Sequence, residues 1–172
     1  MVKVYLVGLP ASGKTTIGKW LAQKMNWEFL DLDECIEAEA KMSVAEYFTQ
    51  FGEEAFRVLE HELLRQTESK EKIIVACGGG TAAYLDNMKW MQERGVTVFL
   101  NIDLGIIQTR IYTNPNQRPH FEGKNILEIR EKLQIMLKNR GDFYYKSKII
   151  WNKSTPNDFL HKAVNQFFTT SF

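Results

Sequence analysis

The sequence is poor in cysteine, and its two cysteines cannot form an extensive covalent or metal-binding framework. Cys35 and Cys77 lie far apart, no CxxC pair is present, and the three histidines are scattered. Small secreted domains that depend on disulfides contain many more cysteines, and zinc sites need clustered ligands. We therefore expect two buried thiols in a reducing compartment and no metal cluster built from cysteine and histidine.

A charge excess and long apolar runs are also lacking. Lys plus Arg number 22 and Asp plus Glu number 21, which gives a net charge of +1, whereas nucleic-acid-binding surfaces need a basic excess. The apolar run at residues 4–7 ends at Gly8 and is too short for a signal segment, and no later run could cross a bilayer. We expect a cytoplasmic protein without nucleic-acid or membrane partners, in which the sequon at Asn152 is accidental.

The rest of the composition is that of one globular domain. The 172 residues are 44% hydrophobic and 25% charged, which is ordinary for a single domain. Short apolar segments alternate with segments of helical spacing, and this alternation predicts an α/β fold with a parallel sheet between two layers of helices. The expected strands are 2–7, 28–32, 73–77, 96–101 and 147–151. The expected helices lie between the first two strands and at 52–67, 85–94, 103–112, 125–140 and 157–169.

A phosphate-binding motif follows the first expected strand. Residues 8–15 read GLPASGKT, which fits GxxxxGK[ST] in the required place between a strand and an amphipathic helix. The glycines let backbone N–H groups surround a phosphate, and the helix N-terminus adds partial positive charge. Lys14 would reach the β- and γ-phosphates, and the Thr15 hydroxyl would ligate Mg²⁺. The guanine-recognition and switch motifs of GTPases are not found, so the pattern favours a kinase.

Two aspartates close the second expected strand. Residues 29–33 read FLDLD, and the two-residue period of a strand would point Asp31 and Asp33 to the same side. At the carboxyl edge of the sheet, beside the P-loop, one could act near Mg²⁺ and the other could accept a proton from an acceptor hydroxyl. The alternative is that Asp33 only caps the next helix.

Two arginines are candidates for binding an anionic acceptor. Arg140 continues an apolar helical stripe, and an inward-facing arginine must meet an anion or strong acceptors; Gly141 is expected to end its helix. Arg57 could join the same site or could form an ordinary i,i+3 salt bridge with Glu60. Two guanidinium groups around one site would favour a carboxylate, which arginine binds in a bidentate manner.

Two further segments have the composition of functional loops. The triplet Gly78-Gly79-Gly80 follows the all-apolar third strand, where three glycines allow close approach of the backbone to an acceptor or form a tight turn. Segment 112–124 is polar, contains two prolines and has no apolar period. A loop of this length in a compact domain is usually functional or disordered, and we expect a lid, with a plain connecting loop as the alternative.

Together these motifs resemble the shikimate kinase family. The residues that carry the resemblance are GLPASGKT at 8–15, FLDLD at 29–33, Ile36-Glu37, GEEAFRVLE at 52–60, CGGG at 77–80, Arg110, Arg118-Pro119, and Arg140 with Tyr144. They follow the family's order over residues 2 to about 148. The resemblance implies transfer of the γ-phosphate of ATP to the 3-hydroxyl of shikimate, which gives shikimate 3-phosphate and ADP in aromatic amino-acid biosynthesis. It also implies a monomeric, five-stranded nucleoside-monophosphate-kinase-like domain, with an acceptor-binding segment at about 32–60 and a lid at about 112–124.

The resemblance also implies a role for each site residue. Nucleotide binding falls to Ala11, Ser12, Gly13, Lys14, Thr15, Thr16, Arg110, which packs on the adenine, and Arg118 on the lid. Mg²⁺ is held by Thr15 and, through water, by Asp31. Catalysis falls to Asp33, which orients the acceptor hydroxyl and could serve as base, with Lys14 and Arg118. The shikimate is bound by Asp33, Arg57, Gly79, Gly80 and Arg140, between the walls formed by Phe48 and Phe56.

Two alternatives of different kinds stay open at this point. A gluconate-type or nucleotide kinase of the same fold is disfavoured by the combination of the two aspartates with the glycine triplet. A P-loop module that binds nucleotide without transferring phosphate is disfavoured by Asp33, because a binder needs no aspartate aimed at an acceptor. The chain departs from the family pattern at His120-Phe121, where two aliphatic residues are usual, and at residues 141–143, where a proline is usual.

Overall fold

A five-stranded, all-parallel sheet forms the centre of the computed structural model, which describes residues 2–114 and 121–169. The strand order is β2-β3-β1-β4-β5. The three inner strands are almost entirely buried, as a sheet covered on both faces requires. The strands are β1 Val2–Val7, β2 Glu28–Asp31, β3 Lys72–Ala76, β4 Val96–Leu100 and β5 Ile149–Trp151. The predicted α/β sheet is confirmed.

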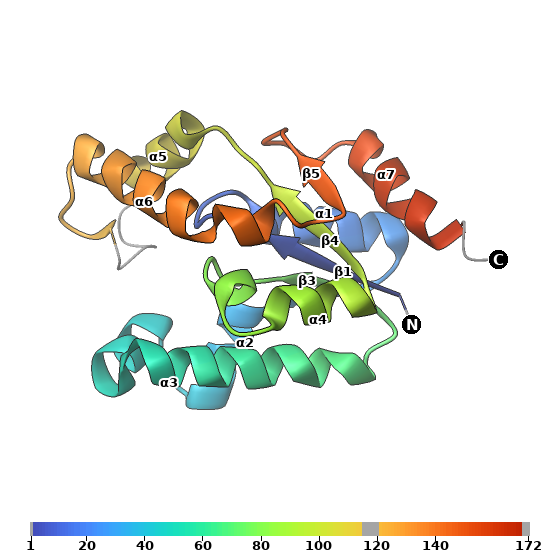
Figure 1. Ribbon diagram of the computed structural model, residues 1–172, viewed down its shortest axis with the longest axis horizontal. Coiled ribbons are helices and arrows are strands. Elements are labelled where there is room, and N and C mark those ends of the chain that lie inside the picture. The colour runs from blue at the N-terminus through green and yellow to red at the C-terminus, as the bar shows by residue number, and fades with distance from the viewer. Residues whose placement is uncertain (1, 115–120, 170–172) are drawn as a thin grey trace.

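Helices cover both faces of this sheet (Figure 1). They are α1 Lys14–Met25, α2 Leu32–Ala40, α3 Val44–Gln66, α4 Asn87–Arg94, α5 Leu104–Thr113, α6 Ile126–Tyr144 and α7 Asp158–Thr169, with 3₁₀ turns η1 Thr67–Ser69 and η2 Thr81–Ala83. Successive residues of a strand point to opposite faces. On β1, Leu6 lies beside Gly18 of α1, whereas the Tyr5 ring lies against Trp90 of α4, with centroids 6.0 Å apart. The helices α1 and α4 therefore cover opposite faces.

The strand order brings two loops of interest together. β1 and β3 are neighbours with Leu6 paired to Ala76, and the Cys77 N–H donates to the Leu6 carbonyl at 3.0 Å. The chain leaves β1 toward β2 on one side and leaves β3 toward β4 on the other, which makes this edge the topological switch point where ligands of such sheets bind. The P-loop and the glycine triplet thus leave the sheet side by side.

The second strand ends one residue earlier than predicted. β2 stops at Asp31, and Leu32 already begins α2, a helix that our prediction contained only in the alternative that Asp33 caps it. The Asp31 side chain accepts the Asp33 N–H at 3.1 Å and so caps the new helix. The helix was hard to detect because only Leu32 and Ile36 are buried in it, too few positions for a clear apolar period.

Two further helix boundaries differ from the prediction. α3 begins at Val44 rather than near 52, with a capping box between Ser43 and Glu46, and it bends at Gly52. α6 runs through Gly141 to Tyr144, so the prediction that Gly141 ends it was wrong. The added turn is held by packing, because the Tyr144 ring stacks on Phe99 of β4 at 5.1 Å.

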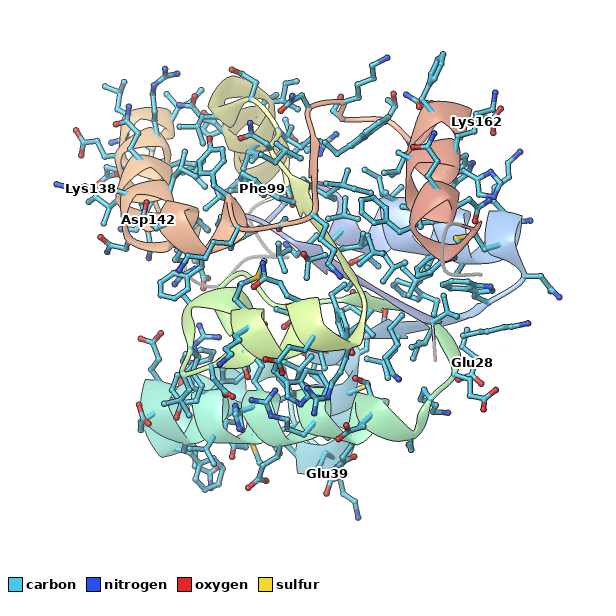
Figure 2. All side chains as sticks on the ribbon, turned by 45° about the vertical axis from the view of Figure 1, so that its right-hand side comes forward. Glu28, Glu39, Phe99, Lys138, Asp142 and Lys162 are labelled. Atoms are coloured by element: carbon cyan, nitrogen blue, oxygen red, sulfur yellow. The ribbon has the colours of Figure 1, made fainter. Side chains whose placement is uncertain are left out.

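Apolar side chains are gathered in the interior and most charged side chains lie at the surface. Figure 2 shows Phe99 in the interior, whereas the labelled charged residues project from the periphery. Both thiols are free; Cys77 is buried as expected, but Cys35 is only partly buried. Within residues 2–114 and 121–169 no helix is both long and apolar enough to span a membrane.

The expected lid is described only in part. Residues 115–120, which include Arg118 and His120, lie outside the described residues, so their predicted roles are not addressed by the structure. Phe121, the second unusual residue of this segment, is buried, and the Lys132 ammonium lies 5.3 Å from its ring centroid. The aromatic ring therefore anchors the C-terminal part of the segment against α6.

Candidate active site

The P-loop forms a cradle at the N-terminus of α1. Gly13 precedes the helix with φ of 98°, a conformation that glycine adopts without a steric penalty. The Lys14 ammonium lies across the loop and donates to the carbonyls of Gly8 (3.0 Å) and Leu9 (2.8 Å). The Ser12 hydroxyl is buried and has no hydrogen-bond partner among the described residues. A cradle with an ammonium, a helix N-terminus and an unsatisfied hydroxyl fits a bound phosphate chain.

A hydroxyl and a carboxylate meet beside this cradle. The Thr15 hydroxyl donates to Asp31 Oδ2 at 2.7 Å, and the other Asp31 oxygen accepts the Asp33 N–H. Oxygen ligands of this kind suit Mg²⁺, which proteins commonly hold through one or two side chains together with substrate phosphates. The two residues predicted to serve the metal therefore lie side by side, and their role toward Mg²⁺ stays a prediction.

Asp33 reaches the site from a helix and not from a strand. It lies in the first turn of α2, so the strand-period argument for its direction was wrong, and it is Asp31 that caps the helix. The Asp33 carboxylate nevertheless faces the glycine triplet, since its Oδ1 lies 3.2 Å from the point where a Cβ on Gly78 would stand. It remains partly exposed, as a group that meets a substrate must be.

Arg57 forms its salt bridge and faces the triplet at the same time. Its Nη1 donates to Glu60 Oε2 at 2.6 Å, and Glu60 is fully buried. The guanidinium lies so close to Gly80 that a Cβ there would stand less than 3.0 Å from it. The Arg57 guanidinium also lies over Phe56, 5.1 Å from the ring centroid, and Phe56 stacks on Phe48 at 4.3 Å. The ordinary ion pair therefore does not exclude Arg57 from the site.

Arg140 approaches the middle glycine from α6. A Cβ on Gly79 would stand 3.5 Å from Arg140 Nη1 and 3.0 Å from the Pro10 ring. The buried Tyr144 hydroxyl donates to the Gly79 carbonyl. Burial raises the pKa of Tyr144 to about 12, although the nearby Arg140 charge lowers it. Tyr144 therefore keeps its proton at neutral pH and holds the triplet between the P-loop and α6.

Each glycine of the triplet is required by a different neighbour. A side chain on Gly78 would collide with Glu60, one on Gly79 would press on Pro10, and one on Gly80 would collide with Arg57. The segment also turns, since the Thr81 N–H donates to the Gly78 carbonyl at 3.3 Å. The sequence left two alternatives for this segment, a tight turn or a close approach of its backbone to other groups. The structure has both.

The remaining predicted nucleotide residues lie around the cradle. Arg110 Nη1 donates to the Ala11 carbonyl at 3.0 Å and Nη2 to the Ser154 carbonyl at 3.2 Å. Its guanidinium therefore joins the P-loop to the segment after β5, and its packing on adenine stays a prediction. Thr16 is exposed in the first turn of α1.

Sequence reasoning missed some of the groups that build the site. Thr81 is fully buried and its hydroxyl lies 2.5 Å from Glu60 Oε1, a contact for which the sequence carries no local signal. Tyr144 lies one helical turn after Arg140, so its position on the same side could have been inferred from the i,i+4 spacing. The burial of Glu60 was not inferred, because i,i+3 ion pairs are usually exposed.

One hollow on the protein lies away from the glycine triplet. It measures about 800 Å³ and lies between Leu30 and Cys35 on one side and residues 63 and 65–70 on the other. None of the predicted site residues lines it. Charged side chains instead converge on the glycine triplet beside the P-loop, and the phosphate-binding motif places the candidate site there.

Comparison with known proteins places the chain among proteins of one family. The family model described as shikimate kinase matches residues 10–169. The shikimate kinase of Bacteroides thetaiotaomicron is 37% identical over 158 residues, which are 92% of this chain and 90% of that protein. The crystal structure of a shikimate kinase from Bacteroides thetaiotaomicron has a TM-score of 0.86 at 34% identity and covers 98% of this chain and 96% of its own. The shikimate kinase from Acinetobacter baumannii in complex with shikimate has a TM-score of 0.84 at 28% identity, with coverage of 99% and 94%.

Proposed function

Because the chain belongs to the shikimate kinase family, we propose that the side chains around its glycine triplet carry out phosphate transfer from ATP to the 3-hydroxyl of shikimate. The products are shikimate 3-phosphate and ADP, in the biosynthesis of aromatic amino acids. The observation that carries the proposal is the convergence of Asp33, Arg57 and Arg140 on Gly78, Gly79 and Gly80, next to the P-loop.

The P-loop binds the phosphates of ATP, the co-substrate. Lys14 now donates to two loop carbonyls, and a phosphate chain in the cradle offers it stronger, charged acceptors. Thr15 and Asp31 are the residues that would hold Mg²⁺, which neutralises charge on the β- and γ-phosphates when bound. The buried Ser12 hydroxyl gains a partner when the cradle is filled, which removes the cost of an unsatisfied polar group.

The acceptor is held by its carboxylate and its hydroxyl. Arg57 and Arg140 bind the carboxylate through charge-assisted hydrogen bonds, while Asp33 accepts a hydrogen bond from the 3-hydroxyl and orients its oxygen toward the γ-phosphate. As the new phosphate ester forms, the hydroxyl proton passes to Asp33. Phe48 and Phe56 wall the site and limit access of water.

The remaining assignments rest on the family pattern and on the chain's charge. The protein is a single kinase domain in which residues 32–60 bind the acceptor and 112–124 form the lid, with Arg118 moving onto the phosphates. It acts as a monomer in the cytoplasm and has no nucleic-acid or membrane partner. The net charge of +1 supports the absence of a nucleic-acid footprint, and the buried Phe121 gives the lid a fixed end.

The test is a coupled ADP-release assay with Mg-ATP and shikimate, gluconate or no acceptor. Shikimate-dependent release that disappears when EDTA removes Mg²⁺ is the expected result. Release without an acceptor would indicate a hydrolase, and release with gluconate alone would keep the P-loop assignment while overturning the acceptor assignment.

A further inference from the structure

Four polar links tie the segment after the glycine triplet to α3. They join side chains at positions 54, 60, 61 and 65 of the helix to side chains within residues 81–87. The pairs are Thr81 with Glu60 (2.5 Å), Tyr84 with Glu54 (2.8 Å), Asp86 with Arg65 (2.5 Å) and Asn87 with His61 (2.8 Å). The segment is therefore fixed against the helix that carries Arg57.

Thr81 is the innermost of these links and is itself fixed from both sides. Its side chain and that of Asn87 are fully buried. Asn87 Nδ2 donates to the Thr81 carbonyl at 2.9 Å, while Asn87 Oδ1 lies 2.8 Å from His61 Nδ1. The Thr81 hydroxyl, in turn, lies within hydrogen-bond distance of Glu60 Oε1 and of the Gly78 carbonyl. The hydroxyl has one proton for these two acceptors, and it donates to the Glu60 carboxylate, which is charged and closer.

The carboxylate that Thr81 contacts determines where Arg57 lies. One oxygen of Glu60 receives the Thr81 hydroxyl, and the other receives Arg57 Nη1 at 2.6 Å. A fully buried carboxylate oxygen that loses its donor must find another or leave its position, because an unsatisfied charged acceptor is costly. The Arg57 guanidinium rests directly on Gly80, so a rotation of Glu60 shifts it relative to the backbone of the triplet.

We propose that Thr81 is a positioning residue for the acceptor: through Glu60, its hydroxyl holds the Arg57 guanidinium in the place where it binds the acceptor carboxylate. The inference rests on the proposed function, which gives Arg57 that role. Thr81 acts through Glu60 and makes no contact with the acceptor itself.

The experiment compares Thr81→Val, which removes the hydroxyl at nearly constant volume, with Thr81→Ser, which keeps it. Thr67→Val is the matched control, because Thr67 is also buried and its hydroxyl donates to the Leu64 carbonyl at 2.7 Å, in η1 at the end of α3. Each variant is assayed for its KM for shikimate, its KM for ATP and its kcat. Shikimate is also compared with its methyl ester, which lacks the negative charge.

Thr81→Val is expected to raise the KM for shikimate about tenfold or more, the effect of losing one hydrogen bond to a charged group. Its KM for ATP should stay near that of the wild type, and its preference for shikimate over the methyl ester should shrink. Thr81→Ser should restore both properties, and Thr67→Val should change neither. The shrunken preference separates positioning of Arg57 from general destabilisation.

A Thr81→Val variant that binds ATP normally and keeps the wild-type KM and ester preference would overturn the inference. If Thr81→Val fails to bind ATP or to fold, Thr81→Ala takes its place, since it removes the same hydroxyl without branching. Failure of both variants to fold would assign Thr81 to stability and overturn its positioning role. Absence of shikimate-dependent ADP release in the wild type would overturn the proposed function, and the inference with it.

Discussion

Asp33, Arg57 and Arg140 come from three different helices and meet over backbone rather than over side chains. Their neighbours are the three glycines after β3, where a Cβ on Gly78 or Gly80 would collide with a charged side chain and one on Gly79 would press on Pro10. At the scale of the residue, the site therefore consists of charged side chains that surround the backbone of the glycine triplet, which has no side chains of its own. Asp33 is predicted to bind the acceptor hydroxyl, and the two arginines are predicted to bind the acceptor carboxylate.

Replacing Asp33 with asparagine should abolish most of the chemistry and preserve nucleotide binding. The amide still forms hydrogen bonds but cannot take the acceptor proton, so kcat should fall by about 10²- to 10⁴-fold, the usual contribution of a general base. The KM or Kd for ATP should change little, because the Asp33 backbone N–H that donates to Asp31 is kept in the variant. Steady-state kinetics measure kcat, and nucleotide titration measures the Kd for ATP. Near-wild-type turnover would show that Asp33 does not take the acceptor proton.

Replacing Arg140 with alanine should weaken acceptor binding. Loss of charge-assisted hydrogen bonds to a carboxylate costs about 1.5–3 kcal/mol, so the KM for shikimate should rise about 10- to 100-fold. Arg130→Ala, on the exposed side of the same helix, is the control and should leave the KM unchanged. If the Arg140 variant changed only the KM for ATP, the arginine would bind the nucleotide phosphates. That result would contradict our assignment of Arg140 to the acceptor carboxylate.

At the scale of the element, α3 is two helical segments joined at one glycine. Gly52 has φ of 82° and ψ of 174°, a backbone conformation that is open essentially only to glycine. The bend lets Phe48, before it, stack on Phe56, after it. The element that carries Arg57 and a wall of the site therefore depends on a single backbone conformation.

Gly52→Ala should destabilise the protein by about 1–3 kcal/mol through backbone strain alone. No atom lies within 4 Å of the position of the added methyl group, so no steric clash contributes. Gly141→Ala is the contrasting variant, because Gly141 is helical and its added Cβ would make only ordinary contacts at 3.7–3.9 Å. It should be neutral or stabilising by up to about 1 kcal/mol. Urea denaturation measures both, and equal effects of the two substitutions would contradict this account.

At the scale of the whole molecule, two buried tyrosines tie stability to alkaline pH. Burial raises the pKa of Tyr5 on β1 and of Tyr144 on α6 to about 12 each, above the usual value near 10. Below pH 10 the folded and unfolded chains both keep these protons, and the stability is fully present. Between about pH 10 and 12 the unfolded chain releases the protons first, so stability falls as pH rises.

The free energy of unfolding should therefore decrease above pH 10 by at most about 1.4 kcal/mol per pH unit for each of the two tyrosines. Tyr144→Phe should remove its own share of this slope. The neighbouring Tyr145→Phe, at a residue that is 52% exposed, should leave the slope as it is in the wild type. Denaturation series at several pH values test this, and equal slopes for Tyr144→Phe and the wild type would contradict it.

The sequence by itself determined the sheet, the P-loop and the kind of chemistry. Apolar periodicity and the GxxxxGK[ST] spacing are local patterns, and each reports on the conformation of its own segment. These patterns located all five strands to within two residues or so and named Lys14, Thr15 and Asp31 as neighbours of the nucleotide. They failed where a local signal was weak or misleading, as for the short α2 or for Gly141, whose helix is extended by packing of Tyr144 on Phe99.

Only the tertiary structure decided which groups meet at the acceptor site. Asp33 faces the triplet because α2 turns it there, and Arg57 remains available although its salt bridge to Glu60 is formed. The Tyr144 hydroxyl reaches Gly79 from 65 positions away, and the Thr81 hydroxyl reaches Glu60 from 21. No spacing along the chain encodes such contacts, because they depend on how separate helices pack against the same edge of the sheet.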